Sequence, residues 1–200
     1  MSALFDRLQR LFDEGHGVEL AGLRDDAGFA PPTVRPAAVL IAVTDRPEPG
    51  VLLTHRPETM RAHPGQIAFP GGKLDPGEDA VAAALREAHE ELGIEAADVR
   101  VIGASDRFVT GSGFDVTPVL GLVPSDLPIR PDPREVSGWF EAPLRFILDE
   151  ANHRQKIGEF RGRERPYLEI DWQGHRIWGV TAAIIHNLSR RLAWQELADG

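Results

Sequence analysis

Three glutamates with helical spacing are the side chains of this sequence best suited to binding a metal ion or to catalysis. Glu87, Glu90 and Glu91 stand at i, i+3 and i+4, so on a helix their carboxylates share one side. Like charges at these spacings repel one another by about 0.2–0.5 kcal/mol per pair, and no Lys or Arg stands four residues from Glu87 or Glu91 to relieve them. Convergent carboxylates on a rigid support suit Mg²⁺, which leaves its other coordination positions to water and substrate phosphate. The spacing favours a metal site, with an ordinary acidic surface as the alternative.

The motif around these glutamates is longer than the glutamates themselves. Five residues separate Gly72 from Glu78, and seven more separate Glu78 from the run REAHEELGI at 86–94. This pattern resembles the complete box of the Nudix hydrolases. The resemblance implies an α/β/α sandwich with a mixed central sheet, and hydrolysis of a nucleoside diphosphate linked to another group, with Mg²⁺ or Mn²⁺ as cofactor.

The same resemblance implies roles for individual residues. The metal ligands would be Glu87, Glu90 and Glu91, joined by the backbone carbonyl of Gly71. Arg86 would hold the glutamates by charge-assisted hydrogen bonds, and Glu78 would support the geometry between loop and helix. The general base stays open between Glu90 and Glu135, which precedes a strand-like segment.

The segment upstream of the box narrows the expected substrate. Residues 52–72, LLTHRPETMRAHPGQIAFPGG, resemble the signature of the coenzyme A pyrophosphatase branch, with Pro57 as a departure where the branch has a small residue. The resemblance implies cleavage of coenzyme A or acyl-coenzyme A into 4′-phosphopantetheine and 3′,5′-ADP. The positions that match the signature are Leu52, Leu53, Thr54, Arg56, Arg61, Gly65, Phe69, Pro70, Gly71 and Gly72.

Two arginines of this segment are candidates for binding phosphate. Arg56 and Arg61, beside the loop that contains Gly71 and Gly72, can clamp phosphate oxygens bidentately, or each can pair with an internal carboxylate instead. The basic stretch 153–165 is interpreted as a solvated hairpin, with a contact to a 3′-phosphate as the sharper alternative. The aromatic residues of the second half are interpreted as core or edge packing rather than a platform for adenine: Trp139, Phe140, Trp172 and Trp178.

Two other functions compete with this one. The first is a Nudix hydrolase that acts on NADH, ADP-ribose or an oxidised nucleoside triphosphate. The second is a Nudix-fold module that binds a ligand without turnover, against which the intact box argues.

The remaining sequence predicts the elements that position these residues. Residues 78–92 form a helix that ends at Gly93, with Val81, Leu85, Ala88 and Leu92 toward a core. On this helix Ala80, Ala83 and Ala84 are expected beside the acidic face, where they leave clearance for a polyanion. Short apolar runs predict strands at 37–44, 50–56, 99–105, 114–123 and 136–142. Further helices are expected at 181–196 and shortly after Pro143, with a charged hairpin at 153–178, which indicates an α/β or α+β domain.

The N-terminal segment precedes this domain. A stripe of apolar residues predicts an amphipathic helix that Gly15 and Gly17 end, and its stripe packs on the domain or on a second subunit, so a homodimer is plausible. We therefore divide the chain into a helix and linker at 1–36 and a Nudix domain at 37–200, within one globular domain overall. The stripe consists of Leu4, Phe5, Leu8, Leu11 and Phe12.

The amino-acid composition excludes several classes of function. The 22 Lys and Arg against 31 Asp and Glu give a net charge of −9, which argues against nucleic acid as a partner. The absence of cysteine excludes disulfides, thiol catalysis and cysteine-bound metals. No apolar run is long enough to cross a bilayer, so neither a membrane nor export is expected and the interpretation is cytoplasmic. The expected partner is a small nucleotide.

Overall fold

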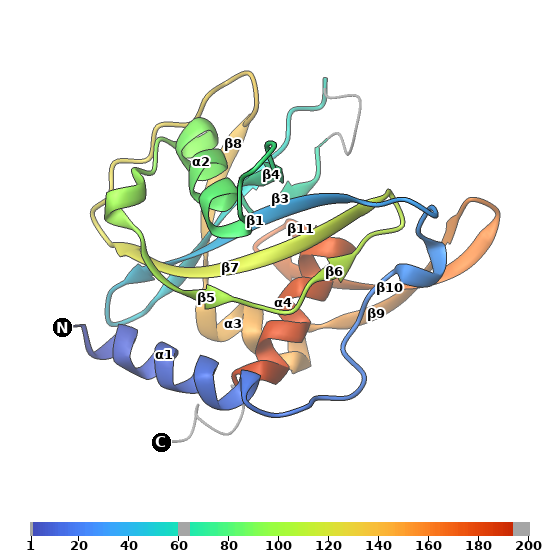
Figure 1. Cartoon of the computed structure of the whole chain (residues 1–200), viewed down its shortest axis with the longest axis horizontal. Helices are drawn as coiled ribbons and strands as arrows, with labels where there is room; N and C mark the ends of the chain where they lie inside the picture. Colours follow the sequence, from blue (N-terminus) through green and yellow to red (C-terminus); the bar gives the residue numbers. More distant parts are fainter. Residues whose placement is uncertain (1, 60–64, 194–200) are drawn as a thin grey trace.

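A mixed β-sheet forms the centre of the computed structural model, which describes residues 2–59 and 65–193 (Figure 1). Its two long strands run parallel along their whole length, with Arg35 opposite Phe114 and Asp45 opposite Pro124. All other pairs are antiparallel, and the order of the principal strands is β3-β2-β1-β7-β5. The strands are β1 Arg35–Asp45, β2 Gly50–His55, β3 Ile67–Ala68, β4 Gly71–Lys73, β5 Arg100–Ala104, β6 Phe108–Val109, β7 Phe114–Pro124 and β8 Gly138–Pro143.

Helices cover both faces of this sheet. Helix α2 lies on one face, and α1, α3 and α4 lie on the other (Figure 1). A separate three-stranded antiparallel sheet, ordered β11-β10-β9, follows α3 in the chain. The α/β/α sandwich with a mixed sheet is thereby confirmed. The bounds are α1 Ala3–His16, α2 Ala80–Leu92, α3 Leu144–Leu148 and α4 Val180–Arg191, with β9 Arg154–Phe160, β10 Arg163–Trp172 and β11 His175–Trp178, and with 3₁₀ turns at Ala27–Phe29, Ala96–Asp98 and Glu150–Asn152.

The hydrophobic core has two parts because the sheet is buried on both faces. Side chains alternate along β1, so that Leu40 packs toward α2 while Ile41 packs toward α4. This double burial explains why the strand reads as a continuous apolar run rather than as an alternating one.

Helix α2 has a capping residue at each end. The Asp79 carboxylate accepts a hydrogen bond from the Ala82 N–H at 2.8 Å, so the helix begins at Ala80, two residues after the expected start. Gly93 adopts the left-handed conformation, with φ of 68°, and ends the helix as predicted. The expectation for Ala83 and Ala84 was wrong: both are fully buried against the sheet, where their small side chains let α2 approach β1 closely.

Helix α1 packs on the core of the domain itself. Leu8, Leu11 and Phe12 are buried in the same cluster as the apolar side chains of α4. The helix also runs through Gly15, which was expected to end it. A Cβ at Gly15 would lie 1.7 Å from the carbonyl oxygen of Arg191, so this glycine permits α1 and α4 to touch.

The predicted strands and helices are present, with differences at their ends. The charged segment 153–178 forms three strands rather than a hairpin, and the short strands β3, β4 and β6 were not predicted. The end of the predicted helix 181–196 lies partly outside the described residues.

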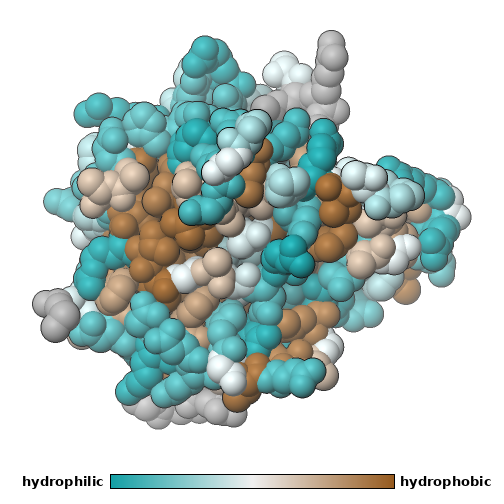
Figure 2. Space-filling view, in the orientation of Figure 1, coloured by the Kyte–Doolittle hydropathy of each residue, from teal (hydrophilic) through white to brown (hydrophobic). Residues whose placement is uncertain are grey.

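Figure 2 shows that apolar side chains on this face gather below α2, while hydrophilic ones cover most of the remainder. No helix within the described ranges is long and apolar enough to cross a membrane.

Candidate active site

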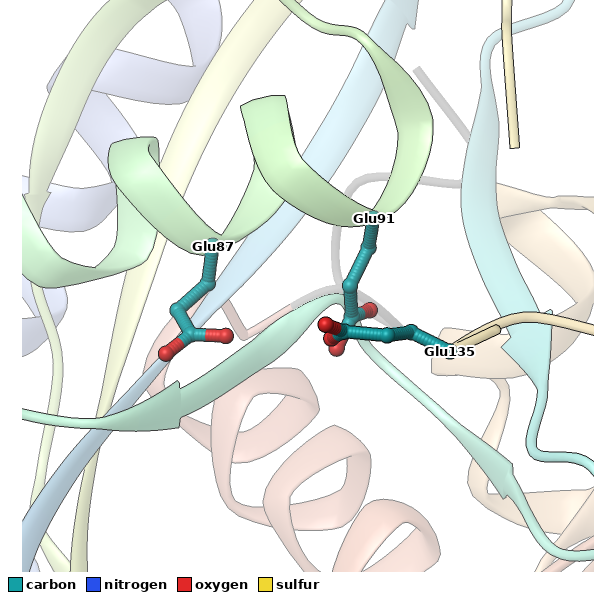
Figure 3. A group of neighbouring side chains, drawn as sticks. All are labelled: Glu87, Glu91 and Glu135. Carbon is teal, nitrogen blue, oxygen red and sulfur yellow. The ribbon is translucent and has the colours of Figure 1, made fainter. Parts of the chain in front are cut away.

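Three carboxylates from two separate segments meet beside the end of α2. Glu87, Glu91 and Glu135 each offer an oxygen within 4.8 Å of the other two, and Figure 3 shows their side chains pointing toward one another. Glu91 is only 5% exposed, which is rare for a carboxylate. Glu90, expected among the metal ligands, lies outside this group and is exposed to solvent.

The main chain places Glu135 beside the helix. The carbonyl of Glu91, unpaired within the helix end, accepts a hydrogen bond from the Asp132 N–H at 3.0 Å. Asp132 in turn accepts from the Glu135 N–H at 3.0 Å, and the Ser137 N–H donates to the His55 carbonyl at 2.9 Å. The loop before β8 is thus fixed at both ends, to α2 and to β2, with Glu135 between the two attachments.

Arg86 joins the helix to the loop that precedes it. Its guanidinium donates to both carboxylate oxygens of Glu78, at 2.9 and 3.0 Å, and to the carbonyl of Lys73 at 3.0 Å. It also donates to Glu87 at 2.9 Å and to Glu90 at 3.3 Å. These bonds to Arg86 lower the pKa of Glu78 and raise the pKa of Arg86 itself. The bonds expected from Arg86 to Glu87 and Glu90 are present, so the side chain fixes the direction of the Glu87 carboxylate.

The cluster has more negative charge than its neighbours neutralise. Burial, followed by the charge of Glu87, raises the pKa of Glu91 to about 8 against the opposing charge of Arg56 and a hydrogen bond from Gly71. Burial is also the main cause that raises the pKa of Glu87, and the nearby Glu135 carboxylate adds to both shifts. One buried and two half-buried carboxylates with oxygen donors this close together fit a divalent cation, whose charge would offset both burial and repulsion.

Two consecutive glycines stand in β4, which pairs with β1 and lies beside the glutamates. A Cβ at Gly71 would lie 2.4 Å from the backbone oxygen of Ala38, on β1. A Cβ at Gly72 would lie 2.3 Å from Oε1 of Glu87. Gly71 therefore permits the close approach to the backbone of β1, and the absence of a side chain at Gly72 leaves room for the Glu87 carboxylate.

Arg56 lies at the edge of the cluster, directly after β2. Its Nε is buried without a hydrogen-bond partner, and within the described ranges its side chain forms no ion pair, although its charge acts on Glu91. Arg61, the second expected phosphate ligand, lies outside the described residues.

The basic stretch 153–165 forms the exposed β9–β10 hairpin. Arg165 at its end is an exception, because it pairs with the buried Asp26. The guanidinium of Arg163 lies over the ring of Phe29, 4.8 Å from its centroid. These contacts attach the hairpin to the linker after α1.

Comparison with known proteins shows which proteins this chain resembles in sequence and in fold. The NUDIX domain model matches residues 34–164. Proteins named "Uncharacterized Nudix hydrolase NudL" from Yersinia pestis (strain Pestoides F) and Yersinia pseudotuberculosis (serotype O:1b) are each 43% identical over 163 residues, which cover 80% of this chain and 81% of the relative. The crystal structure of the Nudix hydrolase RenU from M. smegmatis matches with a TM-score of 0.51 and 21% identity, covering 84% of this chain and 85% of that one. A Deinococcus radiodurans structure matches with a TM-score of 0.50 and 19% identity, covering 84% and 91%. The two structures are similar in fold.

Proposed function

This chain belongs to the NUDIX domain family, and from that premise we propose that it hydrolyses the diphosphate bond of coenzyme A or acyl-coenzyme A to 4′-phosphopantetheine and 3′,5′-ADP. Membership of the family supports the coarser activity, hydrolysis of a nucleoside diphosphate derivative. The observation that carries the proposal is the uncompensated group of Glu87, Glu91 and Glu135 beside Arg56, whose Nε is buried with no hydrogen-bond partner among the described residues. The choice of coenzyme A rests on the signature at 52–72.

The carboxylate cluster fits Mg²⁺ or Mn²⁺. Glu87, Glu91 and Glu135 would hold the cation, with the Gly71 carbonyl as the backbone ligand that the box implies, and with Glu90 as a further ligand after a change of its side-chain rotamer. When bound, the cation would neutralise charge on the diphosphate and lower the pKa of a water molecule that attacks phosphorus.

The side chains of this chain bind the substrate and move the proton. Arg56 presents its guanidinium beside the cluster, where it would bind a diphosphate oxygen through charge-assisted hydrogen bonds. Arg61 and the Gly71–Gly72 loop complete the proposed substrate site. Glu135 is the stronger candidate for the general base, because it lies within the cluster, whereas Glu90 is exposed and bonded to Arg86.

A panel of substrates with metal titration tests this function. The full-length protein is incubated with Mg²⁺ or Mn²⁺ and with coenzyme A, acetyl-coenzyme A, dephospho-coenzyme A, NADH, ADP-ribose and an oxidised nucleoside triphosphate, and the products are identified by mass. We expect the largest kcat/KM for coenzyme A or its thioester, with no turnover in chelator. A preference for NADH, ADP-ribose or the triphosphate would move the protein to the first alternative. Tight ligand binding with no turnover of any compound would identify a binding module.

A further inference from the structure

Trp139 is an aromatic side chain that the fold leaves uncovered near the candidate active site. In the described part of the chain, the exposed large hydrophobic residues are Val18, Trp139 and Ile157, and Trp139, at 40% exposure, is the aromatic one among them. It lies on β8, four residues after Glu135. At this exposure the indole ring has surface left for a further contact.

The alternation of side chains places Trp139 on the face of the sheet that α2 covers. The next residue, Phe140, pairs with Leu53 and packs against the core on the α4 side. Its ring stacks on that of His175, with the ring centroids 3.9 Å apart. Neighbouring residues of a strand point to opposite faces, so Trp139 points toward the side of α2 and the glutamates. Its partner in the register is Thr54.

Arg56 lies two residues beyond Thr54 in the direction of β2. The printed β2–β8 pairs end at His55 and Gly138, and extending this register by one residue makes Arg56 a diagonal neighbour of Trp139. In a sheet this relation separates two residues by about 7–8 Å and remains within reach of long side chains. The charge of Arg56 also acts on Glu91, so its guanidinium lies near the carboxylate cluster. Trp139 and Arg56 therefore occupy the same face of the sheet, the face on which α2 presents Glu91.

We propose that Trp139 stacks on the base of the nucleotide half of the substrate, while Arg56 binds the phosphate attached to the same nucleoside. A nucleoside phosphate holds a flat base and an anion at the two ends of one ribose, which matches an aromatic ring and a guanidinium at diagonal positions. Stacking on tryptophan provides binding energy for a base without a hydrogen-bond code. The inference rests on the proposed function for its choice of ligand, and its test needs no hydrolysis.

Two ligands that differ only in the base test the proposal. Adenosine monophosphate and ribose 5-phosphate share the sugar and the phosphate, and their dissociation constants are measured by calorimetry with the full chain in Mg²⁺. Wild-type protein should bind the adenosine compound more tightly. W139A and W139L should each weaken that binding by about 5- to 150-fold and leave ribose 5-phosphate within about twofold, whereas W139F should stay within about threefold of wild type.

The controls separate stacking from other roles of the residue. Trp139→Leu retains apolar bulk without a ring, and Ile157→Ala removes another exposed apolar side chain, on β9, with no expected effect on either ligand. Arg56→Gln should weaken both ligands. Equal affinity of wild type and W139A for adenosine monophosphate would overturn the proposal, as would an equal loss for both ligands. If the wild type shows this base-dependent binding but hydrolyses no compound of the panel, the proposed function fails and the subsite stands.

Discussion

Gly72 lies directly against the carboxylate of Glu87, so closely that a Cβ at position 72 would fall 2.3 Å from Oε1. The Arg86 guanidinium donates a hydrogen bond to that same Oε1 at 2.9 Å. Gly72 and Arg86 thus both bear on the position of the Glu87 carboxylate, one oxygen of which lies within 4.8 Å of oxygens of Glu91 and Glu135 (Figure 3). The absence of a side chain at Gly72 is thus part of the geometry of the carboxylate cluster.

Substitution of the two glycines should separate catalysis from stability. Gly72→Ala displaces the end of a flexible side chain, so we expect at least about a tenfold loss of kcat with less than about 1 kcal/mol lost in the free energy of unfolding. Gly71→Ala meets the backbone of Ala38 and Val39, so we expect a loss of about 2 kcal/mol or more. Turnover and urea unfolding of both variants check this. Equal stability losses in the two would contradict the distinction.

Glu91→Gln should abolish hydrolysis while stabilising the metal-free fold. Turnover should fall by more than about 10²-fold, because a buried ligand for the cation is lost. Unchanged turnover would refute the metal assignment. In chelator, the neutral amide should raise the free energy of unfolding at about pH 8, since it removes a buried charge next to Glu87.

Without metal, the free energy of unfolding should fall as the pH rises, because the pKa of Glu91 is raised in the folded state. The folded-state pKa, about 8, lies above the ordinary value of 4.5, so between these values the folded chain binds more protons than the unfolded chain. This residue's contribution to stability is therefore lost as the pH rises from about 4.5 to about 8. Urea unfolding in chelator at about pH 5 and about pH 8 should show a smaller loss in Glu91→Gln than in wild type, with Glu95→Gln, an exposed carboxylate, as the control.

Glu135 and Glu90 can be told apart by their pH–rate profiles. If Glu135 is the general base, Glu135→Gln lowers kcat by about 10²-fold or more and removes the acidic limb of the profile. Glu90→Gln should retain that limb, because Glu90 lies outside the cluster and contacts Arg86. The opposite pattern would assign the proton transfer to Glu90.

Arg86→Lys tests whether catalysis needs the planar guanidinium of Arg86, with its several hydrogen-bond donors, or only its positive charge. Lysine cannot reproduce the paired bonds to Glu78 together with the bond to Glu87, so we expect about a tenfold loss of kcat and a higher metal requirement. Arg107→Lys, in an exposed pair with Asp115, is the matched control and should leave both unchanged. A metal titration of the two variants that gave the same result would show that charge alone suffices.

A histidine pair should weaken the fold in mild acid. His153 and His186 are hydrogen-bonded at 3.1 Å, and burial lowers the pKa of both below 6.5. As the pH falls below 6.5, the unfolded chain takes up these protons first, so the stability that the neutral pair contributes is lost toward acid. Urea unfolding between about pH 7.5 and about pH 5.5 should show a shallower loss in His186→Gln than in wild type. His89→Gln, at an exposed position, should follow wild type.

Local patterns in the amino-acid sequence determine much of this protein by themselves. The spacing of Glu87 and Glu91 places two of the clustered carboxylates on one helix, and Gly93 marks where that helix ends, because both depend only on the helical period and on backbone conformation. Apolar runs likewise predict the long strands. The two-residue strands β3 and β6 carry too few residues to give a periodic signal.

Only the tertiary structure decided which carboxylates meet. Glu135 reaches Glu91 because the free carbonyl at the end of α2 binds the loop before β8, a contact between segments that are distant in sequence. Glu90 lies outside the cluster, on the exposed side of α2, where it bonds to Arg86, although its spacing looks equivalent to that of its neighbours. A helical pattern fixes which side of the helix a residue occupies. The packing of the helix on the sheet decides which residues on that side are buried and which are exposed to solvent.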